Sequence, residues 1–284
     1  MKQAIKHLVE RAPGPFPLAT LEALRALRYP EVRSRQRLVR RLFAKVGKPS
    51  HIVCGPFAGM RYDARAYCSA ILPKFLGTYE LEIAPGIEAV AASASDVIVD
   101  IGAAEGYYAV GLALRVPTAR LVAFEMYPPA RALLSRHARR NGVADRVEIR
   151  GECTLDALAE ALDGAERPAV VCDCEGAEDV LLDPDRIAAL RRAIVLVESH
   201  EGMVAGVNDR LRDRFGASHD VTLIPSRPRT VADLPDGVAL DPDEAAAAMD
   251  EQRDWAEWFL MTPKRSEHGP GTGPESSRCP SPVC

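Results

Sequence analysis

Between residues 97 and 200 the chain alternates short apolar runs with segments of helical periodicity. The apolar runs lie at residues 97–101 (interrupted only by Asp100), 121–124, 169–172 and 194–197, and residues 146–149 are expected to form a further short strand. Strands buried on both faces read as unbroken apolar runs, and strands separated by helices of ~10–15 residues form parallel βαβ units. The pattern therefore predicts an α/β fold with a doubly wound, mostly parallel sheet.

Helices are expected in the intervals and on both sides of this region. Their predicted ranges are 79–92, 106–116, 128–141, 154–162, 178–190, 203–215 and 242–252. For the first of them Thr78 is the expected N-cap, with Glu80 and Glu82 in the first turn. Two further apolar segments, 220–224 and 258–261, are expected to be strands that pair antiparallel at the edge of the sheet.

The chain divides into four predicted parts. Residues 1–50 form a helical, basic N-terminal extension with twelve Lys or Arg against three Glu. Residues 51–94 form a cap segment and a lead-in helix, and 95–263 form the main domain. Residues 264–284, rich in Gly, Pro and Ser, form a disordered tail. The basic extension is either a solvated helical face or an arm over an anionic substrate, RNA or a membrane surface.

Net charge, hydropathy and cysteine usage limit the partners and the cellular location to be expected. The net charge of −4 is too mild to imply a nucleic-acid partner, and neither a signal peptide nor a membrane span is expected. The seven cysteines are an odd number without a paired C-x-x-C spacing. This pattern favours a reducing, cytoplasmic location over a disulfide framework or a zinc ribbon.

The clearest local motif runs from Asp100 to Gly106, after a buried strand and before a helix. Gly102 permits a tight turn, and Gly106 allows close packing and close approach of a ligand to the backbone. The spacing is G-x-x-x-G rather than the G-x-G-x-x-G of a dinucleotide site. A carboxylate at Asp100 would repel a pyrophosphate but suits an ammonium group, such as that of S-adenosylmethionine (SAM).

Acidic residues also follow the next two strands. Glu125 comes nineteen residues after Gly106, at a strand end where a carboxylate can accept both ribose hydroxyls. Glu152 follows the third strand and could accept a hydrogen bond from an adenine amino group, although a simple loop explains it equally well.

Candidate catalytic residues follow the fourth and fifth strands. Asp173 and Glu175 should face the crevice at the topological switch point, while Glu178 is expected only to stabilise a helix N-terminus. Glu198 and His200 follow the fifth strand. We expect His200 to act as the general base and Asp173 or Glu175 to orient the acceptor, with Asp173 also contacting the cofactor. In the alternative, Asp173 and Glu198 hold Mg²⁺; no metal ligand is assigned.

These motifs together resemble class I SAM-dependent methyltransferases. Residues 97–106 resemble the first motif of that class, and residues 123–125, 141–142 and 173–178 resemble its FkbM-type branch. The similarity covers about residues 95–200. It implies a seven-stranded, Rossmann-like sheet with a reversed last strand, which residues 258–261 could supply. Cys174 and Met126 depart from the residues common in that branch without disturbing the acidic positions.

The resemblance and the motifs together predict a SAM-dependent O-methyltransferase that acts on a small-molecule hydroxyl, such as that of a sugar or a natural product. The alternatives are an RNA or protein methyltransferase that uses the basic arm, and a SAM-binding protein without turnover. A DNA partner is not expected, because the Asn/Asp-Pro-Pro-Tyr element of nucleobase amino-methylating enzymes is missing. A dehydrogenase is disfavoured by the missing G-x-G-x-x-G.

Overall fold

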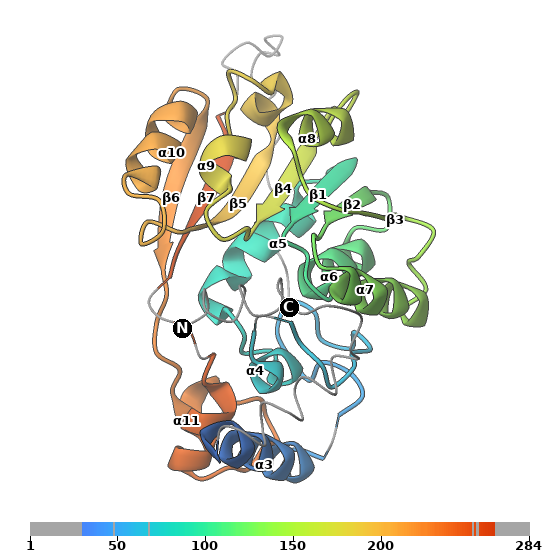
Figure 1. The fold of residues 1–284 in the computed structure, drawn as a ribbon, viewed down its shortest axis with the longest axis vertical. Helices are drawn as coiled ribbons and strands as arrows, with labels where there is room; N and C mark the ends of the chain where they lie inside the picture. Colours follow the sequence, from blue (N-terminus) through green and yellow to red (C-terminus); the bar gives the residue numbers. More distant parts are fainter. Residues whose placement is uncertain (1–29, 48, 68, 252, 254–255, 265–284) are drawn as a thin grey trace, which may run out of the picture.

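The computed structural model describes residues 30–47, 49–67, 69–251, 253 and 256–264, and within these it contains one seven-stranded sheet (Figure 1). The strand order is β3-β2-β1-β4-β5-β7-β6. The strands are β1 Val97–Ile101, β2 Arg120–Phe124, β3 Val147–Arg150, β4 Pro168–Cys172, β5 Ile194–Ser199, β6 His219–Pro225 and β7 Glu257–Pro263. The apolar runs at 97–101, 121–124, 169–172 and 194–197 all lie in strands that are buried between two layers of helices. The short strand predicted at 146–149 is the half-buried edge strand β3, which begins one residue later.

The order of the strands creates the crevice in which a ligand is expected. β1 pairs in parallel with both β2 and β4, so the chain winds away from β1 in both directions. Loops that leave the carboxyl ends of β1 and β4 therefore diverge to opposite faces of the sheet. β7 runs antiparallel to both β5 and β6, which confirms the predicted antiparallel pair and the reversed last strand. The topology is that of a doubly wound, Rossmann-like α/β fold.

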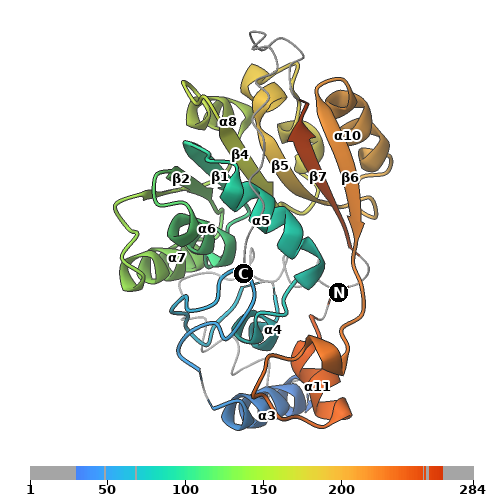
Figure 2. The ribbon, with the colours of Figure 1, turned by 180° about the vertical axis from the view of Figure 1, so that it is seen from behind.

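Helices cover both faces of the sheet (Figures 1 and 2). Alternate residues of each strand point to opposite faces, so Ile98 packs in one core cluster with α5, α6 and α7, while Val99 packs in the other with α8 and α10. The helices of the main domain are α5 Ala84–Ala92, α6 Tyr107–Arg115, α7 Pro128–Arg140, α8 Leu155–Ala161, α9 Glu178–Leu181 and α10 Val207–Gly216.

Three more helices form a small lobe beyond the carboxyl ends of the strands. They are α3 Pro30–Lys45, α4 Ile71–Leu76 and α11 Pro242–Met249. Leu42, Leu76 and Met249, one from each helix, share an apolar cluster of their own. The lobe thus joins the N-terminal extension, the cap segment and the segment before β7, which are far apart in the sequence and lie side by side in Figures 1 and 2.

Three predicted helices differ in the structure. The helix predicted to follow Thr78 begins only at Ala84, because Glu80 has a left-handed backbone (φ 48°) and a 3₁₀ turn, Leu81–Ile83, comes first. Thr78 is therefore not its N-cap. The helix predicted over 178–190 stops at Leu181, two residues before an Asp-Pro pair, and a 3₁₀ segment follows at Ala188–Arg192.

The helix predicted from residue 203 starts instead at Val207, after Gly206 in a left-handed conformation (φ 76°). At the other end of the described chain, Lys264 is the first residue of the predicted tail. Its backbone N–H donates to the carbonyl of Ser218 at 2.9 Å, so it extends the β6–β7 pairing. The rest of the predicted tail and residues 1–29 lie outside the described residues.

Within the described residues no helix combines the length and the apolar character that crossing a membrane requires. The cysteines that the structure describes at positions 54, 153, 172 and 174 are all free.

Candidate functional site

The loop between β1 and α6 is shaped by two glycines with positive φ. Gly102 (φ 84°) donates its N–H to the carbonyl of Phe124 at 2.9 Å, and a Cβ at this position would overlap the carbonyl oxygen of Asp173. Gly106 (φ 92°) precedes α6, where a Cβ would press on Leu134 of α7. Glycine at these positions therefore lets the loops after β1 and β4 approach each other and lets α6 pack against α7.

Glu125 lies at the end of β2, as predicted, and is held by the neighbouring backbone. Its carboxylate accepts hydrogen bonds from the N–H of Ala104 at 2.8 Å and from the N–H of Tyr127 at 2.6 Å. Ala104 has a left-handed backbone (φ 47°), an uncommon conformation for a residue with a Cβ. Each carboxylate oxygen of Glu125 keeps a further lone pair, which suits two hydroxyl donors of a ribose.

Asp100 is buried, with only 2% of its surface exposed, and its Oδ2 has no hydrogen-bond partner among the described residues. Burial, and then the negative charge of Asp173, raise its pKa to about 8. A buried carboxylate oxygen without a partner is costly and calls for an explanation, and an ammonium donor of a bound ligand supplies one. The orphaned oxygen therefore fits the ligand that the sequence predicts.

Two predicted site residues are exposed. Glu152 follows β3 and is exposed, and its role toward an adenine stays a prediction. Glu175 is exposed with a left-handed backbone (φ 56°) and does not join the cluster around His200. Its role in orienting an acceptor also stays a prediction.

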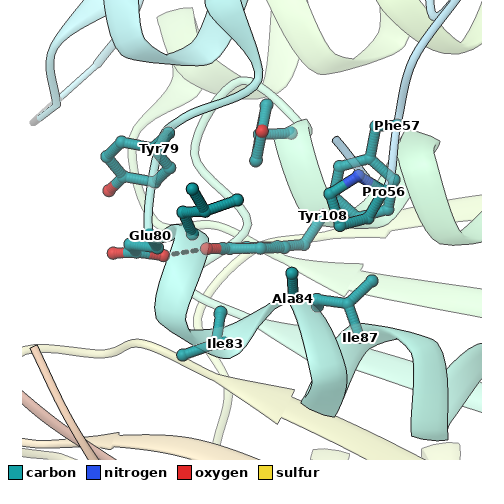
Figure 3. Close-up of a pocket in the computed structure, with 10 residues that line it drawn as sticks. Pro56, Phe57, Tyr79, Glu80, Ile83, Ala84, Ile87 and Tyr108 are labelled. Carbon is teal, nitrogen blue, oxygen red and sulfur yellow. Dashed lines mark hydrogen bonds between the residues drawn. The ribbon is translucent and has the colours of Figure 1, made fainter. Parts of the chain in front are cut away.

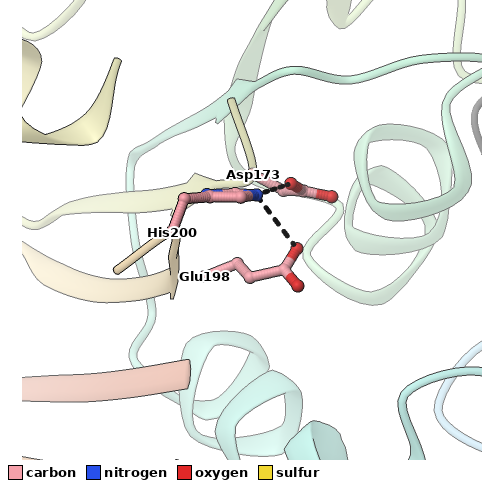
Figure 4. A group of neighbouring side chains, drawn as sticks. All are labelled: Asp173, Glu198 and His200. Atoms are coloured by element: carbon pink, nitrogen blue, oxygen red, sulfur yellow. Dashed lines mark ion pairs between the residues drawn. The ribbon is translucent and has the colours of Figure 1, made fainter. Parts of the chain in front are cut away.

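Asp173, Glu198 and His200 converge beyond the ends of β4 and β5 (Figure 4). The Nε2 of His200 lies 3.6 Å from Asp173 Oδ1 and 3.9 Å from Glu198 Oε2. One donor atom from each side chain lies within 4.8 Å of the others, so the three could hold a divalent cation. The sequence also placed Glu175 with these three residues, but Glu175 does not belong to the group.

The partner of the other ring nitrogen was not predicted. His200 Nδ1 lies 3.0 Å from Oε1 of Glu178, and the same oxygen accepts the backbone N–H of His200 at 2.8 Å. Glu178 is fully buried and does more than stabilise a helix terminus. Desolvation alone would lower the pKa of His200, but the hydrogen bond to Glu178 and the charges of Glu178 and Asp173 outweigh it, and the pKa is raised.

Arg253, a partly buried residue, ties the cluster to the cap. Arg253 Nη1 lies 2.9 Å from Glu198 Oε1 and 2.6 Å from Glu80 Oε1. Burial raises the pKa of Glu198 to about 11, with Asp173 and Glu80 adding to the shift and Arg253 opposing it. Arg253 was not among the predicted site residues, because it lies in a polar segment far from the motifs.

The cap is anchored to the first motif by a buried ion pair. Lys74 Nζ lies 2.5 Å from Glu105 Oε1, and both side chains are almost completely buried. Glu105 also accepts the hydroxyl of Tyr62 at 2.5 Å and the N–H of Tyr67 at 2.8 Å. Glu105 lies inside the predicted motif, but its charge partner in the cap cannot be read from the local sequence.

A pocket lies between the cap and the start of α5 (Figure 3). Phe57, Tyr79 and Tyr108 line it, and the hydroxyl of Tyr108 donates to the buried carboxylate of Glu80. Burial raises the pKa of Glu80 to about 8. Because Glu80 also binds Arg253, this pocket adjoins the acidic cluster on the cap side.

Comparisons with solved structures find similarity to methyltransferases. The O-methyltransferase TomG from Streptomyces achromogenes, involved in tomaymycin synthesis and crystallised with SAM, is 21% identical over 63% of this chain and 78% of that chain, with a TM-score of 0.40. An O-methyltransferase from Bacillus cereus, in complex with SAH, is 17% identical over 81% of this chain and 91% of that chain, with a TM-score of 0.43.

The M1A22 tRNA methyltransferase TrmK of B. subtilis is 11% identical over 62% of this chain and 64% of that chain, with a TM-score of 0.40. Identities and scores of this size indicate neither substrate nor mechanism. No protein-family model and no curated protein matches the chain.

Proposed function

We propose that this chain is a methyltransferase of class I, of the FkbM type, that binds SAM at the carboxyl ends of β1 and β2. The observation that carries the proposal is the buried, unpartnered Oδ2 of Asp100 beside a loop shaped by Gly102 and Gly106. On the adjacent strand, Glu125 is already oriented by two backbone N–H groups. Asp100 would take the ammonium group, Glu125 the ribose hydroxyls and Glu152 the adenine amino group.

The charge of this region favours SAM over a dinucleotide. The carboxylate of Glu125 would repel a pyrophosphate, and the loop lacks the glycine spacing of a pyrophosphate site. SAM carries a sulfonium and an ammonium group, so negative charge around it is favourable. When bound, it supplies a methyl group on a sulfonium that is a good leaving group.

The residues after β4 and β5 would serve the acceptor. We propose that His200 Nε2 takes the proton of the acceptor hydroxyl while the oxygen forms its bond to the methyl group and the electron pair of the broken S–CH₃ bond stays on sulfur. Asp173 and Glu175 would orient the acceptor, with Asp173 also bordering the cofactor. The rest of the rate gain would come from holding the two reactants in line.

The acceptor we propose is a small molecule with a hydroxyl group, such as a sugar or a natural product, methylated in the cytoplasm. The cap supports a small acceptor, because Tyr79 and Glu80 place an aromatic and a carboxyl group beside the acidic cluster. The second candidate, methylation of RNA or protein, would use the exposed basic residues of α3, such as Arg37 and Arg40.

The direct test is calorimetric titration of the whole protein with SAM and, separately, with NADH. We expect saturable binding of SAM and none of NADH. Conversion of SAM to S-adenosylhomocysteine is then measured with a panel of hydroxylated small molecules and with bulk RNA. Binding of NADH in place of SAM would overturn the proposal. Binding of SAM without turnover on any acceptor would leave a SAM-binding protein that is not an enzyme.

A further inference from the structure

The ring of His200 is held on one side only. Its Nδ1 lies 3.0 Å from the Oε1 of Glu178, within hydrogen-bond distance. Its Nε2 has Asp173 at 3.6 Å and Glu198 at 3.9 Å, both beyond the reach of a hydrogen bond. A neutral imidazole carries one N–H, and the nitrogen next to a carboxylate is the one that keeps it.

Glu178 is held as an anion by the backbone around it. Its Oε1 accepts the N–H of His200 at 2.8 Å, and its Oε2 accepts the N–H of Gly176 at 2.9 Å. The side chain is completely buried. Burial alone would raise the pKa of Glu178, but its hydrogen bonds and the charge of His200 bring the pKa below its usual value. The loop after β4 and the start of α9 thus build a fixed negative charge against one nitrogen of His200.

We propose that Glu178 is the positioning residue of His200: by accepting the Nδ1 proton, it fixes the ring orientation and leaves the Nε2 lone pair facing the crevice. The role of Nε2 as a general base toward an acceptor rests on the proposed function. The tautomer of His200 is a property of the free protein and does not. Glu178 touches neither substrate nor cofactor and acts through the imidazole. It does so by fixing which nitrogen carries the proton and by stabilising the imidazolium that forms when Nε2 takes one.

Other charged groups near the ring also act on the pKa of His200. Asp173 and Glu175 lie on the loop after β4, and Glu198 lies at the end of β5 with Arg253 behind it. Burial and the charge of Asp173 raise the pKa of Glu198, and its Oε1 pairs with Arg253 at 2.9 Å, while its Oε2 lies 3.9 Å from the ring. Glu178 is therefore the nearest fixed anion, and it is the one in hydrogen-bond contact with the ring.

The test is nuclear magnetic resonance of the full chain labelled with ¹⁵N-histidine, in EDTA so that no stray cation occupies Nε2. Each of the six histidines gives two ring nitrogen signals, and the loss of one pair in His200→Gln assigns the site. We expect neutral His200 in the wild type to be protonated on Nδ1 and bare on Nε2. We also expect its midpoint of titration to lie above about 6.5, the value of a free histidine.

The variant Glu178→Gln keeps the shape and removes the charge, so the midpoint should fall by about one pH unit or more. Glu178→Asp keeps the charge, so the titration midpoint of His200 should be higher in this variant than in Glu178→Gln. Glu175→Gln is the matched control, since this exposed carboxylate contributes only at longer range. If Glu178→Gln does not fold, the proposal is decided by the tautomer of His200 in the wild type and by the titration midpoint of His200 in Glu178→Asp.

A wild-type ring protonated on Nε2, or a folded Glu178→Gln with an unchanged midpoint, would overturn the proposal. Neither result depends on SAM. Failure of SAM to bind would overturn the proposed function and leave the histidine result standing.

Discussion

The proposed cofactor half and the proposed catalytic half of the strand-end site are built in different ways. In the cofactor half, Asp100, Gly102, Ala104 and Glu125 come from β1, the loop after it and the end of β2. The N–H of Gly102 donates to the carbonyl of Phe124, and the N–H of Ala104 donates to the carboxylate of Glu125. In the catalytic half, the neighbours of His200 and Glu198 come from the cap, from α9 and from the segment before β7. The first half is therefore a local structure, and the second depends on the packing of distant segments.

The largest effect that separates the two halves is expected at His200. His200→Ala should lower turnover ~10²–10⁴-fold, measured as S-adenosylhomocysteine formed with an acceptor that the wild type methylates, and should leave SAM affinity nearly unchanged. EDTA should have no effect on the wild type.

Loss of activity in EDTA with recovery on addition of Mg²⁺ or Mn²⁺ would instead assign Asp173, Glu198 and His200 as ligands of a catalytic cation. Full activity of His200→Ala with EDTA also harmless would leave catalysis to positioning alone.

The junction of the cap and the first motif should dominate stability. Lys74→Met leaves the carboxylate of Glu105 buried without its cation, so the free energy of unfolding should fall by about 3–5 kcal/mol in urea titrations. Arg115→Ala is the control, because Arg115 and Glu88 form an ion pair in which both side chains are a third or more exposed, and it should cost about 1 kcal/mol or less. Equal losses in the two variants would show that the cap is not anchored through Glu105.

This comparison also explains what the sequence could predict. Strand positions, the crevice and the acidic strand ends follow from buried apolar runs and from spacing within a short stretch, and Asp100, Glu125 and His200 lie where these rules place them. Glu178 was assigned a lesser role, because burial of a polar residue in a first helical turn has no local signature. Arg253 went unrecognised because its partners are far apart in the chain.

The predicted start of the helix at residue 79 was wrong for a related reason. Residues 79–92 have helical periodicity, but the chain there must bring Glu80 to Arg253, which it does with a left-handed residue and a 3₁₀ turn. A tertiary contact overrode local propensity at this position. Strain of this kind at Glu80, Ala104 and Glu175, all beside the crevice, is typical of functional sites.

A smaller effect concerns the dependence of stability on pH. The folded pKa of Asp100 is raised to about 8, whereas the unfolded value is about 3.9, so between these values the folded chain binds a proton that the unfolded chain does not. The free energy of unfolding should therefore fall as pH rises from about 4 to 8. Asp100→Asn should remove its share, at most about 1.4 kcal/mol per pH unit, measured by urea unfolding at pH 5, 6, 7 and 8. An unchanged slope in this variant would show that Asp100 is ionised in the folded protein.

The central claim, that the carboxyl ends of β1 and β2 bind SAM, is tested most directly by calorimetric titration of SAM into Asp100→Ala and Glu125→Ala. Each variant should lose about 1–3 kcal/mol of binding free energy, the scale of a lost hydrogen bond to a charged group. Glu160→Ala is the control on an exposed part of α8 and should bind as the wild type does. Unchanged affinity in both site variants would contradict the assignment of this crevice as the SAM site.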